Sequence, residues 1–198
     1  MKFIYSFLII LTCFFPYTLF SASFAPLKDG KNIFPINKYL TYFIDQKGNL
    51  TIKDLVSKES SIIFKKHKHN IPNFGYTNSV IWYRFTLKNI DHPEKEWFVI
   101  FNPPNVGEAD FYIPQNNVYQ KFKQGLKMQG KNKNLLSRNP AMLVKVPKNT
   151  KKTIYMRIKT NFSNHAQISV VNRFSLFKTM FTLALFTRIF QVIIISIL

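Results

Sequence analysis

The sequence has 198 residues, enough for one domain with a sizeable core and short extensions. Its aromatic content of 16% excludes an intrinsically disordered chain, and six glycines argue against a glycine-rich phosphate-binding loop. The formal net charge of +19 would suit a polyanionic partner, and no acidic residue lies beyond Asp110. Lysine is, however, abundant together with asparagine, isoleucine, phenylalanine and tyrosine. This joint enrichment favours a general compositional bias, so we expect no nucleic-acid partner.

The first 23 residues have the pattern of a secretory signal peptide. Lys2 supplies a positive charge, an apolar run covers residues 3–20, and three small residues at 21–23 offer a cleavage site. The only cysteine, Cys13, lies inside this run, so the mature chain would have no thiol for catalysis, disulfide formation or metal binding. We therefore predict export with cleavage near residue 23, followed by a linker at residues 24–31.

The middle of the chain predicts β-strands rather than long helices. Alternating or apolar runs occur at residues 39–44, 61–64, 80–87, 97–101, 109–113, 141–146, 153–160 and 167–171. Segments rich in Pro, Gly, Asn and Asp separate them, and one short helix is predicted after Thr51, which can cap it ahead of Asp54. Many short strands indicate an all-β sandwich or barrel.

Two of these strands carry an aromatic residue and an arginine on the stripe opposite their apolar residues. Trp82 and Arg84 hold these positions in residues 80–87, and Tyr155 and Arg157 hold them in residues 153–160. If the strands share a sheet, these side chains gather on one surface. Flat aromatic rings beside charged hydrogen-bonding groups suit a sugar or a small anion.

A purely structural role explains the same stripe. An arginine stacked on an aromatic ring contributes about 0.5–1 kcal/mol at an exposed site. Tyr112 and Asp110 lie on the polar stripe of residues 109–113, and a cross-strand pair of Arg84 with Asp110 would add about 0.2–1 kcal/mol. From the pattern alone, this structural interpretation is favoured.

The last twenty residues, 179–198, are predicted to form an apolar helix that crosses a membrane. Twelve of them are Ile, Leu, Val or Phe, which together contribute about −4 to −7 kcal/mol to insertion. Arg188 near the middle costs about 2.5–3.5 kcal/mol on the same scale, so insertion is marginal. The alternative is a helix that lies in the membrane interface with Arg188 among the headgroups.

Several segments, in order, resemble a family of bacterial sensor domains. The most specific is "FGYTNSVIWYRFTLKN" at residues 74–89. It resembles the type 2 extracellular domain of seven-transmembrane receptors with diverse intracellular signalling modules (7TMR-DISM). Similar to the family are also "YFIDQKGNLTIKDL" (42–55), "ADFYIP" (109–114), "SRNPAMLVKVP" (137–147) and "TIYMRIKT" (153–160). The resemblance covers residues 32–173.

The resemblance implies a jelly-roll-like β-sandwich, similar to carbohydrate-binding modules, on the periplasmic face of the inner membrane. Its ligand is expected to be a small or carbohydrate-like molecule. Because the family continues into seven helices and an output module, the sequence is expected to be a truncated receptor or a gene fragment. The alternative is a free-standing exported module that binds a carbohydrate or a polyanion.

We predict that a ligand meets the face that carries Trp82 and Arg84. The further candidate ligand-binding residues are Tyr112, Arg138, Tyr155 and Arg157. Arg138 is included because "SRNP" matches an arginine position of the family, and a loop arginine can close over an anion.

No enzyme, metal site or cofactor is predicted. The sequence lacks Gly-x-Ser-x-Gly and His-Glu-x-x-His motifs. His67 and His69 have lysine neighbours that would repel a cation, and no further ligand lies near them in sequence. Acidic pairs occur within residues 94–96 and 108–110, but nothing in the resemblance supports glycoside hydrolysis by them.

Overall fold

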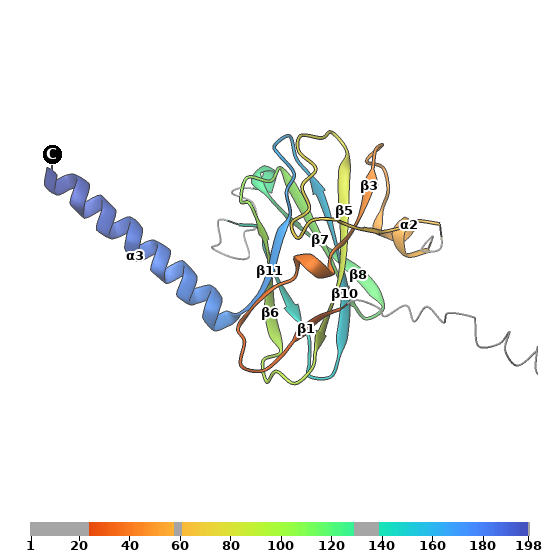
Figure 1. Ribbon diagram of the computed structural model, residues 1–198, viewed down its shortest axis with the longest axis horizontal. Helices are drawn as coiled ribbons and strands as arrows, with labels where there is room; N and C mark the ends of the chain where they lie inside the picture. The colour runs from red at the N-terminus through yellow and green to blue at the C-terminus, as the bar shows by residue number, and fades with distance from the viewer. Residues whose placement is uncertain (1–23, 58–60, 129–138, 198) are drawn as a thin grey trace, which may run out of the picture.

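The computed structural model describes residues 24–57, 61–128 and 139–197, which form a β-sandwich followed by a long helix (Figure 1). The predicted signal peptide at residues 1–23 and the candidate ligand residue Arg138 lie outside the described residues. The predicted all-β sandwich is confirmed, because two antiparallel sheets enclose one main core.

The larger sheet has seven strands in the order β4-β3-β5-β10-β7-β8, with β1 paired in parallel to β5. Both β3 and β1 lie on the side of β5 away from β10, because β10 occupies the other side. The bounds are β1 Ala25–Leu27, β3 Thr41–Asp45, β4 Lys65–Lys66, β5 Val80–Asn89, β7 Glu108–Gln115, β8 Val118–Gln124 and β10 Lys151–Lys159.

The smaller sheet has four strands in the order β2-β11-β6-β9. The bounds are β2 Ile33–Pro35, β6 Glu96–Asn102, β9 Ala141–Lys145 and β11 Gln167–Asn172. Short 3₁₀ helices, η1 at Asn37–Tyr39 and η2 at Leu126–Met128, precede β3 and follow β8.

The main core lies between the two sheets and follows the alternation in the sequence. The apolar stripe of β5, with Ile81, Tyr83 and Phe85, faces Trp97 and Phe101 of β6 across this core. All five side chains are almost completely buried. The alternation therefore predicted correctly which side of β5 faces the core.

Several predicted element boundaries need correction. Residues 61–64 form no strand, and the two-residue strand β4 begins just after them. The strands β1, β2 and β8 were not predicted, because the first two are only three residues long and β8 is rich in polar residues. Short edge strands carry too few residues for an alternating pattern to stand out.

The predicted short helix is present as α2 (Ile52–Ser57), and its capping chemistry is the one expected. The hydroxyl of Thr51 donates to Oδ2 of Asp54 at 2.7 Å, and the backbone N–H of Thr51 donates to the same oxygen at 2.9 Å. These bonds satisfy groups that a helix start leaves without intrahelical partners. They fix α2 at the start of the segment that covers the outer face of the seven-stranded sheet.

The C-terminal helix α3 (Arg173–Ile197) begins directly after β11 and projects away from the sandwich (Figure 1). The side chain of Asn172 caps it by accepting a hydrogen bond from the N–H of Ser175 at 2.9 Å. In the described part of the chain, no helix is long and apolar enough to cross a membrane. The predicted span at residues 179–198 therefore finds no support among the described residues.

Candidate functional site

Cross-strand rows of side chains lie on the outer face of the seven-stranded sheet. In one row Trp82, Arg157 and Asp110 are neighbours on β5, β10 and β7. In the next row the neighbours are Arg84, Tyr155, Tyr112 and Lys121. The expectation that the aromatic and charged stripes gather on one surface is therefore confirmed.

The expected pair of Arg84 with Asp110 is wrong, because β10 lies between their two strands. The carboxylate of Asp110 instead lies 2.8 Å from Nζ of Lys121 and 3.7 Å from Nη1 of Arg157. The guanidinium of Arg84 stacks on the ring of Phe64, with its Cζ 4.4 Å from the ring centroid. Such stacking stabilises the fold and is the structural role that the sequence suggests for an arginine on this stripe.

The aromatic half of this face, which carries Trp82 and Tyr155, is closed. Trp82 has 0% and Tyr155 has 3% of its surface exposed. Both pack in a second apolar cluster that includes Leu55 of α2 and Tyr112, whose ring centroid lies 5.3 Å from that of Trp82. The segment around α2 thus covers these rings, and direct contact of Trp82 with a ligand remains an untested prediction.

The charged half of the face is open. A cavity of about 470 Å³ lies over β10, β7 and β8 beside the loop that follows β3. Arg157 and Tyr112 line this cavity, together with Asp110, Glu108 and Lys121. Two of the six candidate residues from the sequence therefore border an open cavity, next to the closed aromatic cluster.

The loop after β3 forms one wall of the cavity and is held by Asp45. Its buried carboxylate accepts hydrogen bonds from the N–H groups of Gly48 at 2.8 Å and Leu50 at 3.0 Å. Gly48 has a φ of +67°, a left-handed conformation that side chains with a Cβ rarely adopt. This turn presents the carbonyl oxygen of Gly48, which accepts a hydrogen bond from Nη2 of Arg157 at 3.4 Å.

A second turn positions Lys127 on the opposite wall. Gly125 has a φ of +105°, and a Cβ there would lie 2.7 Å from the carbonyl oxygen of Gly107. Only glycine allows this approach, which lets the N–H of Lys127 donate to the same oxygen at 3.1 Å. Nζ of Lys127 then lies 2.7 Å from Oε1 of Glu108.

Cations outnumber carboxylates in this cavity. Arg157 contacts both acids, since its Nη1 lies 3.5 Å from Glu108 in addition to its contact with Asp110. The four cationic lining residues are Lys121, Lys123, Lys127 and Arg157. Of the described residues that line it, only Glu108 and Asp110 are acidic, so the cavity is net positive and favours an anionic group.

The pKa shifts of Glu108 and Lys121 favour the charged form of each side chain. The hydrogen bond from Lys127 lowers the pKa of Glu108, despite partial burial that acts in the opposite direction. Burial lowers the pKa of Lys121, but the hydrogen bond and charge of Asp110 outweigh it and the net shift is upward. Burial raises the pKa of Tyr112, so its hydroxyl stays protonated and can donate to a ligand.

Five charged lining residues were not among the predicted ligand-binding residues: Glu108, Asp110, Lys121, Lys123 and Lys127. Lys121 lies on β8, where "VYQKFKQ" alternates, so Tyr119, Lys121 and Lys123 share one face of the strand. This alternation was the available signal, but it is hard to recognise because both faces of the strand carry polar as well as apolar residues. Lys127 lies outside all predicted strands, and only the turn at Gly125 brings it to Glu108. Within the described ranges, no group of three His, Cys, Asp or Glu residues could hold a metal ion.

Comparison with known proteins identifies the family. Residues 37–172 match the family 7TMR-DISM extracellular 2. The chain belongs to this family. Its members are extracellular sensor domains of membrane receptors, which implies an exported location, a ligand and association with a membrane. No curated protein matches the chain.

Two solved structures show a distant likeness to this 7TMR-DISM domain. A selenomethionine-labelled β-glucosidase from Kluyveromyces marxianus is 12% identical, with a TM-score of 0.40, and the match covers 77% of this chain. The same enzyme in complex with glucose is 11% identical, with a TM-score of 0.41 and coverage of 76%. The chain spans 19% of the length of each enzyme chain, and neither likeness bears on what the domain binds.

Proposed function

We propose that the chain is the periplasmic ligand-sensing domain of a bacterial transmembrane signalling receptor, and that its ligand occupies the cavity beside Arg157. The observation that carries this proposal is the open, net positive cavity of about 470 Å³ on the outer sheet face. It has the size and the few convergent polar groups that are typical of small-molecule sites.

The ligand class follows from the groups that line the cavity. Lysine ammonium groups and the Arg157 guanidinium bind a carboxylate or a phosphate, whereas Glu108 and Asp110 accept hydrogen bonds from hydroxyl groups. The Tyr112 hydroxyl can donate or accept. An acidic sugar combines an anionic group with several hydroxyls and therefore fits this set better than a neutral sugar does.

Calorimetric titration of the full chain with D-galacturonate and D-galactose tests the site. We expect saturable binding of galacturonate and at least about tenfold weaker binding of galactose, since only the former carries a carboxylate. Lys123→Gln removes a lining charge that forms no ion pair among the described residues, and it should weaken galacturonate binding. Lys66→Gln, on the exposed strand β4 at the opposite edge of the same sheet, is the matched control. Equal binding of both sugars, or equal effects of both substitutions, would contradict the proposed site.

The helix α3 is proposed to hold the domain at the membrane by lying in its interface. Phe174, Phe181 and Leu185 are exposed and recur along one side of the helix, where they can enter the boundary between headgroups and acyl chains. The cationic residues Lys178 and Arg188 can meet anionic headgroups. Vesicle flotation of the full chain tests this, and Phe174→Ser with Phe181→Ser should release it. Unchanged flotation of this variant would contradict a role for α3.

The second candidate function is a free-standing exported module that binds a carbohydrate or a polyanion. The same cavity supports it, and the helix discriminates between the two. A chain that binds galacturonate but stays unbound to vesicles favours the free-standing module.

A further inference from the structure

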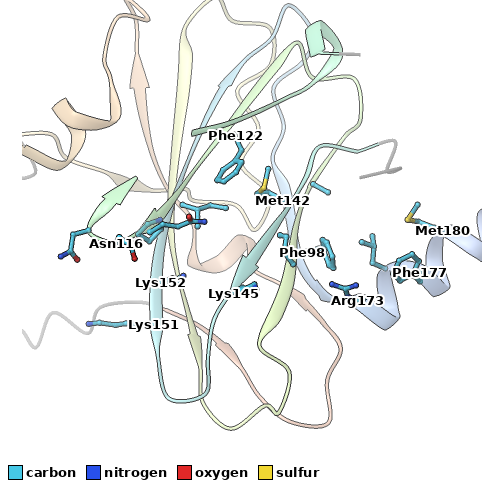
Figure 2. Close-up of a pocket in the computed structure, with 17 residues that line it drawn as sticks. Phe98, Asn116, Phe122, Met142, Lys145, Lys151, Lys152, Arg173, Phe177 and Met180 are labelled. Carbon is cyan, nitrogen blue, oxygen red and sulfur yellow. The ribbon is translucent and has the colours of Figure 1, made fainter. Parts of the chain in front are cut away.

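A second and larger cavity lies beside the edge strand β9 and the start of α3. Its volume is about 1140 Å³, just above the range of about 300–1,000 Å³ that is usual for ligand pockets. The hairpin of β7 and β8 forms one wall, the edge strand β9 lies in the middle, and the start of α3 forms the other wall (Figure 2).

Much of this cavity is apolar. Phe122 and Met142 line it between the two sheets, and Phe98, Phe177 and Met180 line it where α3 leaves the sandwich (Figure 2). Strand β9 ends the four-stranded sheet, so no described strand pairs with its outer edge. The apolar surface therefore continues around β9 from the sandwich interior to the helix.

The polar groups of the cavity are strongly biased toward positive charge. Lys145, Lys151, Lys152 and Arg173 line it, and none of its described lining residues is acidic. The nearby Glu96 neutralises part of this charge, because its carboxylate oxygens lie 3.3 Å from Nζ of Lys145 and 2.7 Å from Nη2 of Arg173. The hydrogen bonds from Arg173 and Lys145 accordingly lower the pKa of Glu96.

Lys152 occupies an unusual position for a charged residue. It lies on the same stripe of β10 as Ile154 and Met156, which face the main core, and its cross-strand neighbour is the buried Leu87. Among the described residues, neither Lys152 nor the adjacent Lys151 forms an ion pair, and Lys152 is half-buried. A charged group at the edge of an apolar space is stabilised by a counter-ion, which a bound anion would supply here.

We propose that this cavity binds an amphipathic anion, a molecule with one anionic headgroup on an apolar chain. The headgroup lies at Lys151 and Lys152, and the chain extends along Phe122 and Met142 toward α3. An inorganic anion would leave the apolar walls uncovered, and a neutral apolar molecule would leave the lysines without a counter-ion. The proposal does not depend on the cavity beside Arg157, which has different walls and a different ligand class.

Laurate below its critical micelle concentration is the probe, titrated calorimetrically into the full chain in phosphatidylcholine nanodiscs with empty nanodiscs as the blank. We expect one saturable site, and at least about tenfold weaker binding of dodecanol and of butyrate. Dodecanol lacks the charge and butyrate lacks the chain. Absence of saturable laurate binding, or dodecanol binding of equal strength, would overturn the proposal.

The combined substitution Lys151→Gln with Lys152→Gln should weaken laurate binding by about tenfold or more. Lys148→Gln is the matched control, because Lys148 lies exposed in the connection between β9 and β10 and does not line the cavity. If the double variant does not fold, Lys152→Arg keeps the charge and should bind laurate, whereas Lys152→Gln alone should bind it less. Equal affinities of the lysine variants and the control would overturn the proposal.

Two further measurements complete the test. One identifies the source of the anion, and the other shows whether the two cavities bind independently. Laurate that is displaced when phosphatidylglycerol replaces part of the phosphatidylcholine identifies a membrane lipid as the source of the same chemistry. Laurate that is retained identifies a free amphiphile. The Lys123→Gln variant should keep full laurate affinity, so failure of the galacturonate site leaves this test intact. Loss of laurate binding in Lys123→Gln would contradict an independent site.

Discussion

The two halves of the outer sheet face are built from the same strands and the same alternation, yet one is closed and the other is open. Trp82 and Tyr155 lie under the segment around α2 and act as core residues. Arg157 of β10 and Asp110 of β7 border a cavity. Alternation assigns side chains to a face of the sheet. Whether that face meets solvent depends on a segment elsewhere in the chain.

The largest effect is expected from Trp82→Ala in the closed half. Truncation of a buried aromatic residue lowers the free energy of unfolding by about 3–5 kcal/mol, because a cavity replaces packed atoms. Denaturant titration of the full chain measures this change. Tyr76→Ala is the control, because Tyr76 is 83% exposed and its loss should change stability by less than about 0.5 kcal/mol. A loss for Trp82→Ala as small as that of the control would mean that the aromatic half is open.

The next largest effect is expected in α2, which covers the aromatic half of the face. Leu55→Ala removes the buried contact of α2 with the aromatic cluster and should lower the free energy of unfolding by about 2–3 kcal/mol. Val56→Ala, on the exposed side of the same helix, controls for altered helix propensity. Acrylamide quenching of tryptophan fluorescence should rise for Leu55→Ala alone, since Trp97 stays in the main core. Unchanged quenching would show that α2 does not cover Trp82.

A smaller effect is expected from the loop that borders the open half. Asp45→Ala removes the acceptor for the N–H groups of Gly48 and Leu50, at a cost of about 1–2 kcal/mol of unfolding free energy. Galacturonate affinity should fall as well, because the Gly48 carbonyl oxygen no longer stays at Arg157. Asp29→Ala, in an exposed turn before β2, is the control. Full galacturonate affinity in Asp45→Ala would remove this loop from the site.

The smallest effect is a pH dependence of the open half. The pKa of Glu108 is lower in the folded protein than its usual value near 4.5, so its carboxylate stabilises the fold above about pH 4.5. This contribution is lost as the pH falls through the lowered folded pKa, and it amounts to less than about 1 kcal/mol because the site is partly exposed. Glu108→Gln should therefore flatten the unfolding free energy between pH 3 and pH 6.

Glu94→Gln, in the turn before β6, controls for the loss of one negative charge in that pH series. An equally steep pH dependence in Glu108→Gln and in the unsubstituted protein would assign the acid sensitivity to other carboxylates.

Much of the fold was predictable from local patterns. The alternation of β5 and β10 identified their core stripes, and the Thr51 cap identified α2. The strand pairs could not be predicted, because register depends on contacts between residues far apart in the sequence. Asp110 therefore received the wrong partner, since the placement of β10 between β5 and β7 is a property of the topology.

The site was predictable only in part, for the same reason. Tyr112 and Arg157 were identified from their stripe, whereas Lys121 and Lys127 reach the cavity through a strand and a turn with weak signals. The larger cavity at β9 and α3 had no sequence signal, because its lining comes from four separate segments of the chain.

The most direct test of the central claim is chemical-shift mapping of the full chain, isotopically labelled, during titration with D-galacturonate. The account predicts saturable shifts at Lys121, Lys123 and Arg157, which line the open cavity, and much smaller shifts at the buried Trp82 indole. Shifts that centre on Trp82 and Arg84, with the lining of the cavity unaffected, would contradict the assignment of the ligand to the charged half.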